Sequence, residues 1–395
     1  MVLGYTVNSD LSGADGIFSN WQNLYIHIPF CVSKCGYCAF YSETQSSLNR
    51  RHQYLDALLE RLRKYRFSAP LASVYIGGGT PNFLTVPELE KLFTGICSIV
   101  PLADDCEISC ELNPECLTAD KLALLKNFAT RLSLGVQSFD AEVRRILMRQ
   151  CSQARLLETL SMLQKEWTGH FNIDLIYGVS SVPWQVFEND LQTALSYGVD
   201  HLSCYALTAE ENSRLGLQSP LAADRDAAEW WLRIGEFLQA YDIHRYEISN
   251  YARENCCCQH NVNVWLGGTL LGIGAGAAGF DGKDRYTEIA DIDAFIAGEG
   301  AEIDRISPIL RMLEIFAVNL RTSRGWMKSD WEKLYSGSWH YLHELCAGQA
   351  GAEPEKWIVE RDHIALSKQG LLFWDDVAME ILDWEIRLKD EIFKI

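Results

Sequence analysis

Short apolar runs alternate with longer amphipathic segments over most of the chain. The runs have the length of strands and are closed by proline, glycine or polar residues, a pattern typical of buried strands. We predict strands at residues 24–28, 73–76, 106–111, 131–136, 171–176 and 201–206. Apolar side chains at helical spacing predict helices at 51–66, 89–96 and 118–128, in the region up to about 165, at 186–196 and at 230–238.

The strand–helix unit repeats about six times, which indicates a parallel sheet whose strands are connected by helices. Six units predict an α/β fold of the TIM-like kind, an open partial (β/α)6 barrel rather than a closed barrel of eight. Beyond about residue 290 the alternation ends. We therefore predict an N-terminal extension at residues 1–20, the barrel at 21–290 and a smaller C-terminal domain at 291–395.

Composition places the chain among soluble globular proteins, with 48% hydrophobic and 22% charged residues in 395. The net charge of −18 disfavours binding to nucleic acid or to an anionic membrane, since both need clusters of Lys and Arg. Residues 1–20 do not resemble a secretory signal, and no apolar run reaches the ~18 residues of a membrane span. We therefore expect a cytoplasmic protein without stable membrane insertion, whose 13 cysteines are free or metal-bound thiols.

Three cysteines follow the first predicted strand in the spacing Cys31-x3-Cys35-x2-Cys38. Such thiolates can bind an iron–sulfur cluster, bind zinc with a fourth ligand from elsewhere, or carry redox chemistry. The spacing favours the cluster, because the other comparable pair, Cys106 and Cys110, lies in a strand that would hold its sulfurs roughly 13 Å apart. With no fourth cysteine nearby, a four-iron cluster would keep one iron open to an exogenous ligand.

Polar residues also follow the later strands, at the points where the strands end. They are Gly77-Gly78-Gly79-Thr80 after the second strand, then Glu111, Gln137, Asp174 and the segment around Ala206. In barrels of this kind the chemistry lies at the carboxyl ends of the strands. The sequence therefore predicts a single site at this rim, in which the cysteines and these residues lie together.

Several motifs together resemble one branch of the radical S-adenosylmethionine superfamily, that of the oxygen-independent coproporphyrinogen III oxidase and the heme chaperone HemW. The motifs are Tyr25-Ile-His-Ile-Pro-Phe-Cys31 through Cys38, Gly77-Gly-Gly-Thr-Pro81, Glu111-Leu-Asn-Pro114, Arg131 to Phe139, Asn172-Ile-Asp-Leu-Ile-Tyr-Gly178 and Tyr246-Glu-Ile-Ser-Asn250. The similarity covers about residues 21 to 290 in order and continues, more weakly, to the end.

The resemblance implies a [4Fe–4S] cluster on Cys31, Cys35 and Cys38, with S-adenosylmethionine bound at the open iron through its amino and carboxylate groups. The glycines would let the backbone approach this cofactor closely, and the carboxylates would accept hydrogen bonds from its ribose or ammonium group. The implied cofactor contacts are Tyr25, Tyr37, Gly78, Gly79, Thr80, Glu111, Gln137, Arg149, Asp174 and Ala206. We interpret His27 as a packed histidine rather than a ligand.

Two features favour the chaperone over the oxidase within this branch. Phe40 stands where the oxidase usually has a further cysteine, and about twenty residues precede the first strand, whereas the oxidase has a longer N-terminal segment. The chaperone would bind heme and pass it to an acceptor protein that the sequence does not identify.

The alternative is the oxidase itself, an oxidoreductase of the coproporphyrinogen dehydrogenase type. It would use a 5′-deoxyadenosyl radical to decarboxylate propionates of coproporphyrinogen III to protoporphyrinogen IX, and it would need an electron donor. An iron–sulfur electron carrier is a third class, which explains the cysteines but not Glu111, Gln137 and Asp174.

A heme-associated pattern of the chaperone family, His-Asn-x-x-Tyr-Trp, is partly present at His260 to Trp265. A neutral imidazole is a common iron ligand, so His260 is the predicted axial ligand of heme. Val264 replaces the tyrosine, and Ala278 stands where a histidine is usual in the following glycine-rich run. The preceding Cys256-Cys257-Cys258 have no predicted role: three adjacent residues cannot easily face one metal, although one thiolate could help to hold heme.

Overall fold

The computed structural model describes residues 17–44, 46–208, 213–218, 227–386 and 388, so the predicted N-terminal extension lies outside it up to residue 16. Parallel strands form the centre of the main sheet. They are β2 Asn23–Ile28, β6 Leu71–Gly78, β7 Leu102–Leu112, β8 Arg131–Gln137, β9 His170–Tyr177 and β10 His201–Ala206. Each of these strands contains one of the predicted strands, which confirms all six.

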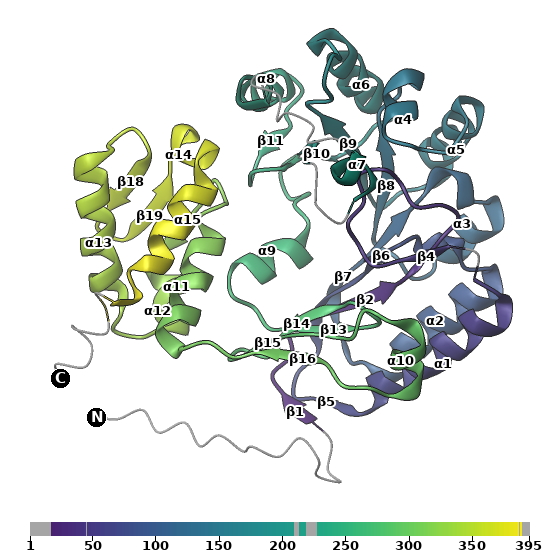
Figure 1. Cartoon of the computed structure of the whole chain (residues 1–395), viewed down its shortest axis with the longest axis horizontal. Coiled ribbons are helices and arrows are strands. Elements are labelled where there is room, and N and C mark those ends of the chain that lie inside the picture. The colour runs from purple at the N-terminus through teal and green to yellow at the C-terminus, as the bar shows by residue number, and fades with distance from the viewer. Residues whose placement is uncertain (1–16, 45, 209–212, 219–226, 387, 389–395) are drawn as a thin grey trace.

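Helices connect consecutive strands and cover the outer face of the sheet (Figure 1). In α1, Ser47 caps the first turn by accepting the N–H of Arg50, and one face buries Tyr54, Leu58 and Leu62 in the core. The predicted helical region up to about residue 165 is in fact two helices separated at Met148. The helices are α1 Leu48–Arg63, α2 Val86–Ile99, α3 Ala119–Leu125, α4 Ala141–Ile146, α5 Gln153–Glu166, α6 Trp184–Ser196 and α8 Ala227–Gln239.

The main sheet extends beyond the predicted strands at both ends. β13 Leu270–Ile273 is parallel to β2 and is followed by antiparallel β14 Ala278–Phe280, β15 Arg285–Thr287 and β16 Glu302–Asp304. At the other end, β12 Asn250–Ala252 is antiparallel to β10 and pairs with β11 His244–Arg245. Within the described residues the order is β11-β12-β10-β9-β8-β7-β6-β2-β13-β14-β15-β16. The sheet does not close, so the fold is a partial barrel, and the predicted domain boundary at residue 290 falls between β15 and β16.

Shorter elements shape the two ends of the barrel. β1 Ile17–Ser19 is parallel to β5 Tyr65–Phe67, and β3 Phe30–Cys31 is parallel to β4 Glu43–Thr44. Among the short helices, α9 Gln259–Trp265 packs against β6, β2 and α11 Pro308–Asn319. These helices are η1 Pro81–Phe83, η2 Pro114–Cys116, α7 Arg214–Gln218, α9 Gln259–Trp265 and α10 Ile292–Ala297.

A second group of elements forms the C-terminal part, drawn in yellow-green in Figure 1. Three antiparallel strands, β17 Trp326–Met327, β19 His363–Leu366 and β18 Trp357–Glu360, pack with α11 Pro308–Asn319, α12 Lys328–Leu334, α13 Trp339–Ala352, α14 Lys368–Leu372 and α15 Trp374–Asp383. Tryptophans supply much of this core: the side chains of Trp326 and Trp331 are fully buried, with ring centroids 4.9 Å apart. None of the described helices is long and apolar enough to cross a membrane.

Candidate cofactor site

A cavity of about 560 Å³ lies at the carboxyl ends of the central strands. Its wall consists of the cysteine loop, residues 31–42, together with the ends of β6 to β10. The prediction that the polar strand ends meet at one rim is therefore confirmed. The predicted residues that line the cavity are Cys31, Cys35, Tyr37, Cys38, Gly78, Gly79, Thr80, Glu111, Gln137, Arg149, Asp174 and Ala206.

The cysteine loop is held in place by backbone hydrogen bonds at its start and in its middle. The Thr80 N–H donates to the Phe30 carbonyl at 2.8 Å, and the Gly36 N–H donates to the Leu147 carbonyl at 3.1 Å. After Cys31 the chain follows bends and turns up to residue 42 rather than a regular helix. The loop therefore wraps around its three cysteines and presents them to the cavity.

Two polar side chains contact the cysteine sulfurs directly. The Thr80 hydroxyl donates to Cys31 Sγ at 3.5 Å, and Arg149 Nη1 donates to Cys35 Sγ at 3.2 Å. Burial raises the pKa of the Cys31 and Cys38 thiols. A positive charge and hydroxyl donors favour the thiolate form, which is the form that binds metal.

Arg149 reaches the cavity because α4 ends in a tight turn. Met148 has a left-handed backbone with φ of 56°, which reverses the chain direction directly before Arg149. The guanidinium also donates from Nη2 to Asn113 Oδ1 at 3.3 Å and to the Gly135 carbonyl. Arg149 thus joins the cysteine loop to the ends of β7 and β8, rather than forming a surface charge after a helix.

Gly78 ends β6 and Gly79 follows it, and the packing around both positions requires glycine. Gly78 has φ of +104°, and a Cβ built there would lie 2.5 Å from the His27 ring. A Cβ at Gly79 would lie 2.8 Å from the carbonyl oxygen of Ile28. Side chains at these positions would therefore collide with β2 and the turn after it, so the structure gives a different reason for the glycines than close approach of a ligand.

Glu111 is the carboxylate at the end of β7. Its Oε1 accepts the Tyr75 hydroxyl at 2.9 Å and its Oε2 accepts the Gly78 N–H at 3.0 Å. Burial, with the nearby charge of Asp174, raises the pKa of Glu111 to about 7. A carboxyl group held in this way titrates near neutral pH, and a ligand that offers a hydroxyl or a positive charge would stabilise its charged form.

Asp174 is held on β9, which is separated from β7 by β8, by donors from Asn172 and Ser133. Its Oδ1 accepts Asn172 Nδ2 at 2.7 Å and its Oδ2 accepts the Ser133 hydroxyl at 3.1 Å, while burial raises its pKa. Gln137 has φ of 73° at an irregularity of the β8–β9 register, and its amide lies over Gly135. This local departure from strand geometry places the Gln137 side chain at the cavity.

Tyr25 is a predicted contact that does not line the cavity. Its hydroxyl lies 3.0 Å from His27 Nδ1, and its ring stacks on Tyr75 with centroids 6.2 Å apart. His27 Nε2 is 2.9 Å from the Tyr41 carbonyl, and His27 is 2% exposed, which confirms that it is a packed residue. Tyr25 therefore lies in a layer of side chains beneath the cavity, where it packs on Tyr75, which in turn contacts the cavity residue Glu111.

His260 also lies away from the cavity, in the barrel interior. Its side chain is 5% exposed, its Nδ1 is 2.8 Å from the Ser73 hydroxyl, and its backbone N–H donates to Glu107 at 3.1 Å. The Tyr75 ring lies between the two sites, because it packs on the His260 ring at 5.1 Å while its hydroxyl reaches Glu111. The structure thus does not bring His260 together with the cysteines.

Several residues at the mouth of the cavity were not predicted from the sequence. Phe40 and Tyr205 line it and are 65% and 43% exposed, and Ile176 and Leu207 add apolar surface beside them. From the sequence, Phe40 was noted only because it stands where the oxidase usually has a further cysteine. Tyr205 is adjacent to Ala206, and the two-residue period of a strand gives no reason to expect both side chains at one cavity.

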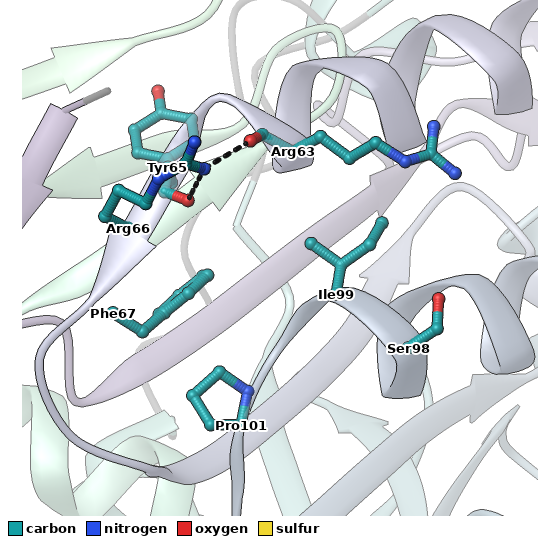
Figure 2. A pocket seen from close by; sticks show the side chains of 7 residues that line it. All are labelled: Arg63, Tyr65, Arg66, Phe67, Ser98, Ile99 and Pro101. Carbon is teal, nitrogen blue, oxygen red and sulfur yellow. Dashed lines mark hydrogen bonds between the residues drawn. The ribbon is translucent and has the colours of Figure 1, made fainter. Parts of the chain in front are cut away.

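A second pocket lies beyond the amino ends of β6 and β7 (Figure 2). Arg66 Nη1 donates to the backbone carbonyl of Arg63 at 3.1 Å, and Arg63 pairs with Glu60 at 2.8 Å. Both cations are therefore engaged by their own segment, and we assign the pocket no role. Its wall consists of Arg63, Tyr65, Arg66, Phe67, Ser98, Ile99 and Pro101.

Comparison with known proteins agrees with this architecture. Residues 25–194 match the Radical SAM superfamily. The heme chaperone HemW of Escherichia coli strain K12 is 35% identical over 262 residues, which are 65% of this chain and 69% of that protein. The chain belongs to the HemW-like family of radical SAM proteins. HemW of Bacillus subtilis is 31% identical over 374 residues, 90% of this chain and 98% of that protein.

The HemW-like fold is also seen in a solved structure. Coproporphyrinogen III oxidase (HemN) from Escherichia coli superposes with a TM-score of 0.78 over 92% of this chain and 90% of that chain, at 20% identity. At this identity the likeness shows a shared fold. Membership of the radical SAM superfamily implies a [4Fe–4S] cluster and S-adenosylmethionine.

Proposed function

We propose that this HemW-like protein is a heme chaperone, which binds heme and passes it to an acceptor protein in the cytoplasm. The observation that carries the proposal is the similarity to proteins named heme chaperone HemW, at 31% identity over 98% of the length of one of them. Phe40 supports the same choice, because it lies exposed at the cavity mouth where the oxidase usually has a further cysteine.

In this proposal Cys31, Cys35 and Cys38 hold the cluster. The donor set fits, because the three thiols face one cavity and no other described cysteine lines it. Arg149 and Thr80 would support the cluster by donating hydrogen bonds to the cysteine sulfurs. A [4Fe–4S] cluster held by these residues would supply one-electron reducing chemistry toward S-adenosylmethionine.

The remaining cavity residues would hold S-adenosylmethionine. Glu111 and Asp174 offer carboxylate oxygens for hydroxyl or ammonium donors, and Gln137 offers an amide. Arg149 has further N–H groups for a carboxylate, beyond those given to the protein. Tyr37, Gly78, Gly79, Thr80 and Ala206 would contact the cofactor from the wall, whereas Tyr25 would act through the layer beneath.

Heme would bind through His260 on the other side of the Tyr75 ring. Burial lowers the pKa of His260 to about 4, so its imidazole is neutral at physiological pH and able to bind iron. Because Ser73 holds Nδ1, iron would be bound by Nε2. The imidazole is nearly inaccessible, so heme binding requires α9 to move away from Glu107.

One experiment separates the chaperone from the oxidase. The cluster is reconstituted anaerobically, S-adenosylmethionine, dithionite and coproporphyrinogen III are added, and protoporphyrinogen IX and 5′-deoxyadenosine are measured. We expect no protoporphyrinogen. Its formation would establish the oxidase instead.

A parallel heme titration tests His260. We expect His260→Ala to change the absorbance spectrum of bound heme, and the exposed His244→Ala to leave the spectrum unchanged. If His260→Ala binds heme with the wild-type spectrum, another residue is the axial ligand.

A further inference from the structure

Three metal-binding side chains meet at the end of the barrel opposite to the cofactor cavity. His170 is the first residue of β9, Asp200 directly precedes β10, and Cys256 lies in the loop between β12 and α9. One ligand atom from each of them lies within 4.8 Å of the other two. None of the three lines the cofactor cavity.

The imidazole and the carboxylate are fixed relative to each other. His170 Nδ1 lies 2.6 Å from Asp200 Oδ2, and Asp200 Oδ1 accepts the Phe171 N–H at 2.8 Å. The backbone of Asp200 is held as well, because its carbonyl accepts the Arg253 N–H at 2.9 Å. The side chains of His170 and Asp200 are 38% and 22% exposed, so an ion can reach them from solvent.

The loop that carries Cys256 is also held in a defined conformation. Arg131 Nη2 donates to the carbonyls of Cys256 at 2.8 Å and Cys257 at 3.0 Å. The Cys256 N–H closes a turn on Arg253 at 3.1 Å, with Asn255 in the left-handed region at φ of 62°. Cys256 is thus presented to the His170–Asp200 pair by a rigid turn.

The other two cysteines of the run do not belong to this cluster. Cys258 points inward and its Sγ lies 3.4 Å from Glu107 Oε1. Cys257 is not part of the group of ligand atoms. The structure therefore agrees with the expectation that three adjacent cysteines do not face one metal, and it singles out Cys256.

We propose that His170, Asp200 and Cys256 form a zinc site, separate from the iron–sulfur centre. A nitrogen, a carboxylate oxygen and a sulfur are the ligands that Zn²⁺ combines, and three protein ligands leave a fourth tetrahedral position for water. Zinc bond lengths hold ligand atoms about 3.2–3.6 Å apart. His170 Nδ1 and Asp200 Oδ2, now 2.6 Å apart, would therefore separate by about 1 Å, and bonds to the ion would replace their hydrogen bond. Cys256 Sγ, within 4.8 Å of both, would approach by a similar distance. On binding, the Cys256 thiol loses its proton to solvent, and the thiolate and carboxylate together balance the charge of the ion.

The site would tie the loop before α9 to the starts of two barrel strands. Cys258 caps α9, and α9 begins one residue after it. A bound ion would therefore limit the movement of this helix relative to β9 and β10. This inference does not depend on heme binding, since zinc binding is measured by itself.

The test uses the full chain with its cluster reconstituted anaerobically, so that zinc cannot occupy the cluster cysteines. Zn²⁺ is titrated in competition with a chromogenic chelator, and bound zinc per chain is measured by mass spectrometry. We expect one zinc per chain, bound at least about 100-fold more weakly in Cys256→Ser, Asp200→Asn and His170→Gln. The matched control is Cys257→Ser, which removes the neighbouring thiol and is expected to bind zinc as the wild type does.

Cobalt provides a second measurement in a chain whose Cys31, Cys35 and Cys38 are replaced by alanine. We expect Co²⁺ to give a thiolate charge-transfer band that is lost in Cys256→Ser. The proposal is overturned if the wild type binds no zinc, if Cys256→Ser and His170→Gln bind it unchanged, or if Cys257→Ser loses as much affinity. Circular dichroism of the zinc-free variants checks that they are folded. If Cys256→Ser does not fold, His170→Gln, which changes a partly exposed side chain, still tests the site.

Discussion

Replacing Glu111 with glutamine is expected to change how the stability of the cofactor-free chain depends on pH. Burial and Asp174 raise the pKa of Glu111 to about 7 in the folded chain, from 4.5 for an ordinary glutamate. Between these two values the folded chain binds more protons than the unfolded chain. Stability from this group is therefore highest below the unfolded pKa and is lost as the pH rises through the folded pKa.

The size of the effect follows from the pKa difference. Complete loss corresponds to about 3 kcal/mol, and the part that falls between about pH 5.5 and pH 8 is about 2 kcal/mol. Glutamine carries no charge and can still accept the Gly78 N–H and contact the Tyr75 hydroxyl, so its hydrogen bonds are kept. The variant should therefore become more stable than the wild type as the pH rises across this range.

Urea denaturation followed by tryptophan fluorescence measures the difference, on cluster-free chains across this pH range. Glu90→Gln, which removes an exposed carboxylate on α2, is the matched control and should run parallel to the wild type. A difference in stability between Glu111→Gln and the wild type that is equal at both ends of the range would contradict a raised pKa of Glu111 in the folded chain.

Three further variants test other parts of the structure. Arg149→Gln removes a donor to the cysteine loop, so iron and sulfide content after reconstitution should fall, with cluster retention weaker by roughly tenfold or more. Glu107→Gln leaves the buried Arg131 cation without its ion-pair partner, so the free energy of unfolding in urea titrations should fall by about 3–5 kcal/mol. The loss should be smaller in the double variant Glu107→Gln/Arg131→Met, because the unpaired cation is then absent. Gly78→Ala should cost about 1–3 kcal/mol or more, because φ is +104° and its Cβ would meet a buried ring, whereas Gly300→Ala, which faces open space, should leave the melting temperature unchanged.

The central strands could be predicted because each contains a short run of buried, mostly apolar residues. The rim could be predicted too, since parallel strands put their carboxyl ends on one edge. The outer strands β11 to β16 were missed because strands of two to four residues leave no pattern in a sequence. Their positions depend on pairing with β10 and β2, which is a tertiary property.

Within the site, spacing predicts which residues lie at the rim but not how they point. The left-handed backbone at Met148 interrupts a helical pattern without a glycine or proline to indicate it. The direction of the Arg149 side chain could therefore not be predicted from the sequence. The side of the barrel occupied by His260 depends on the packing of α9 against β6 and not on its motif. The His170, Asp200 and Cys256 group joins three distant segments, with no common spacing to indicate it.

The main sheet ends in very short strands, two residues in β11 and three in β16. An open sheet offers unpaired N–H and C=O groups at its edges, and these can pair with the edge of another molecule. Edges this short give a second copy little to pair with. The chain can therefore keep an open barrel, with room for a cofactor, without the risk of edge-to-edge aggregation, and an insertion that lengthens β16 should promote that aggregation before it disturbs the cavity.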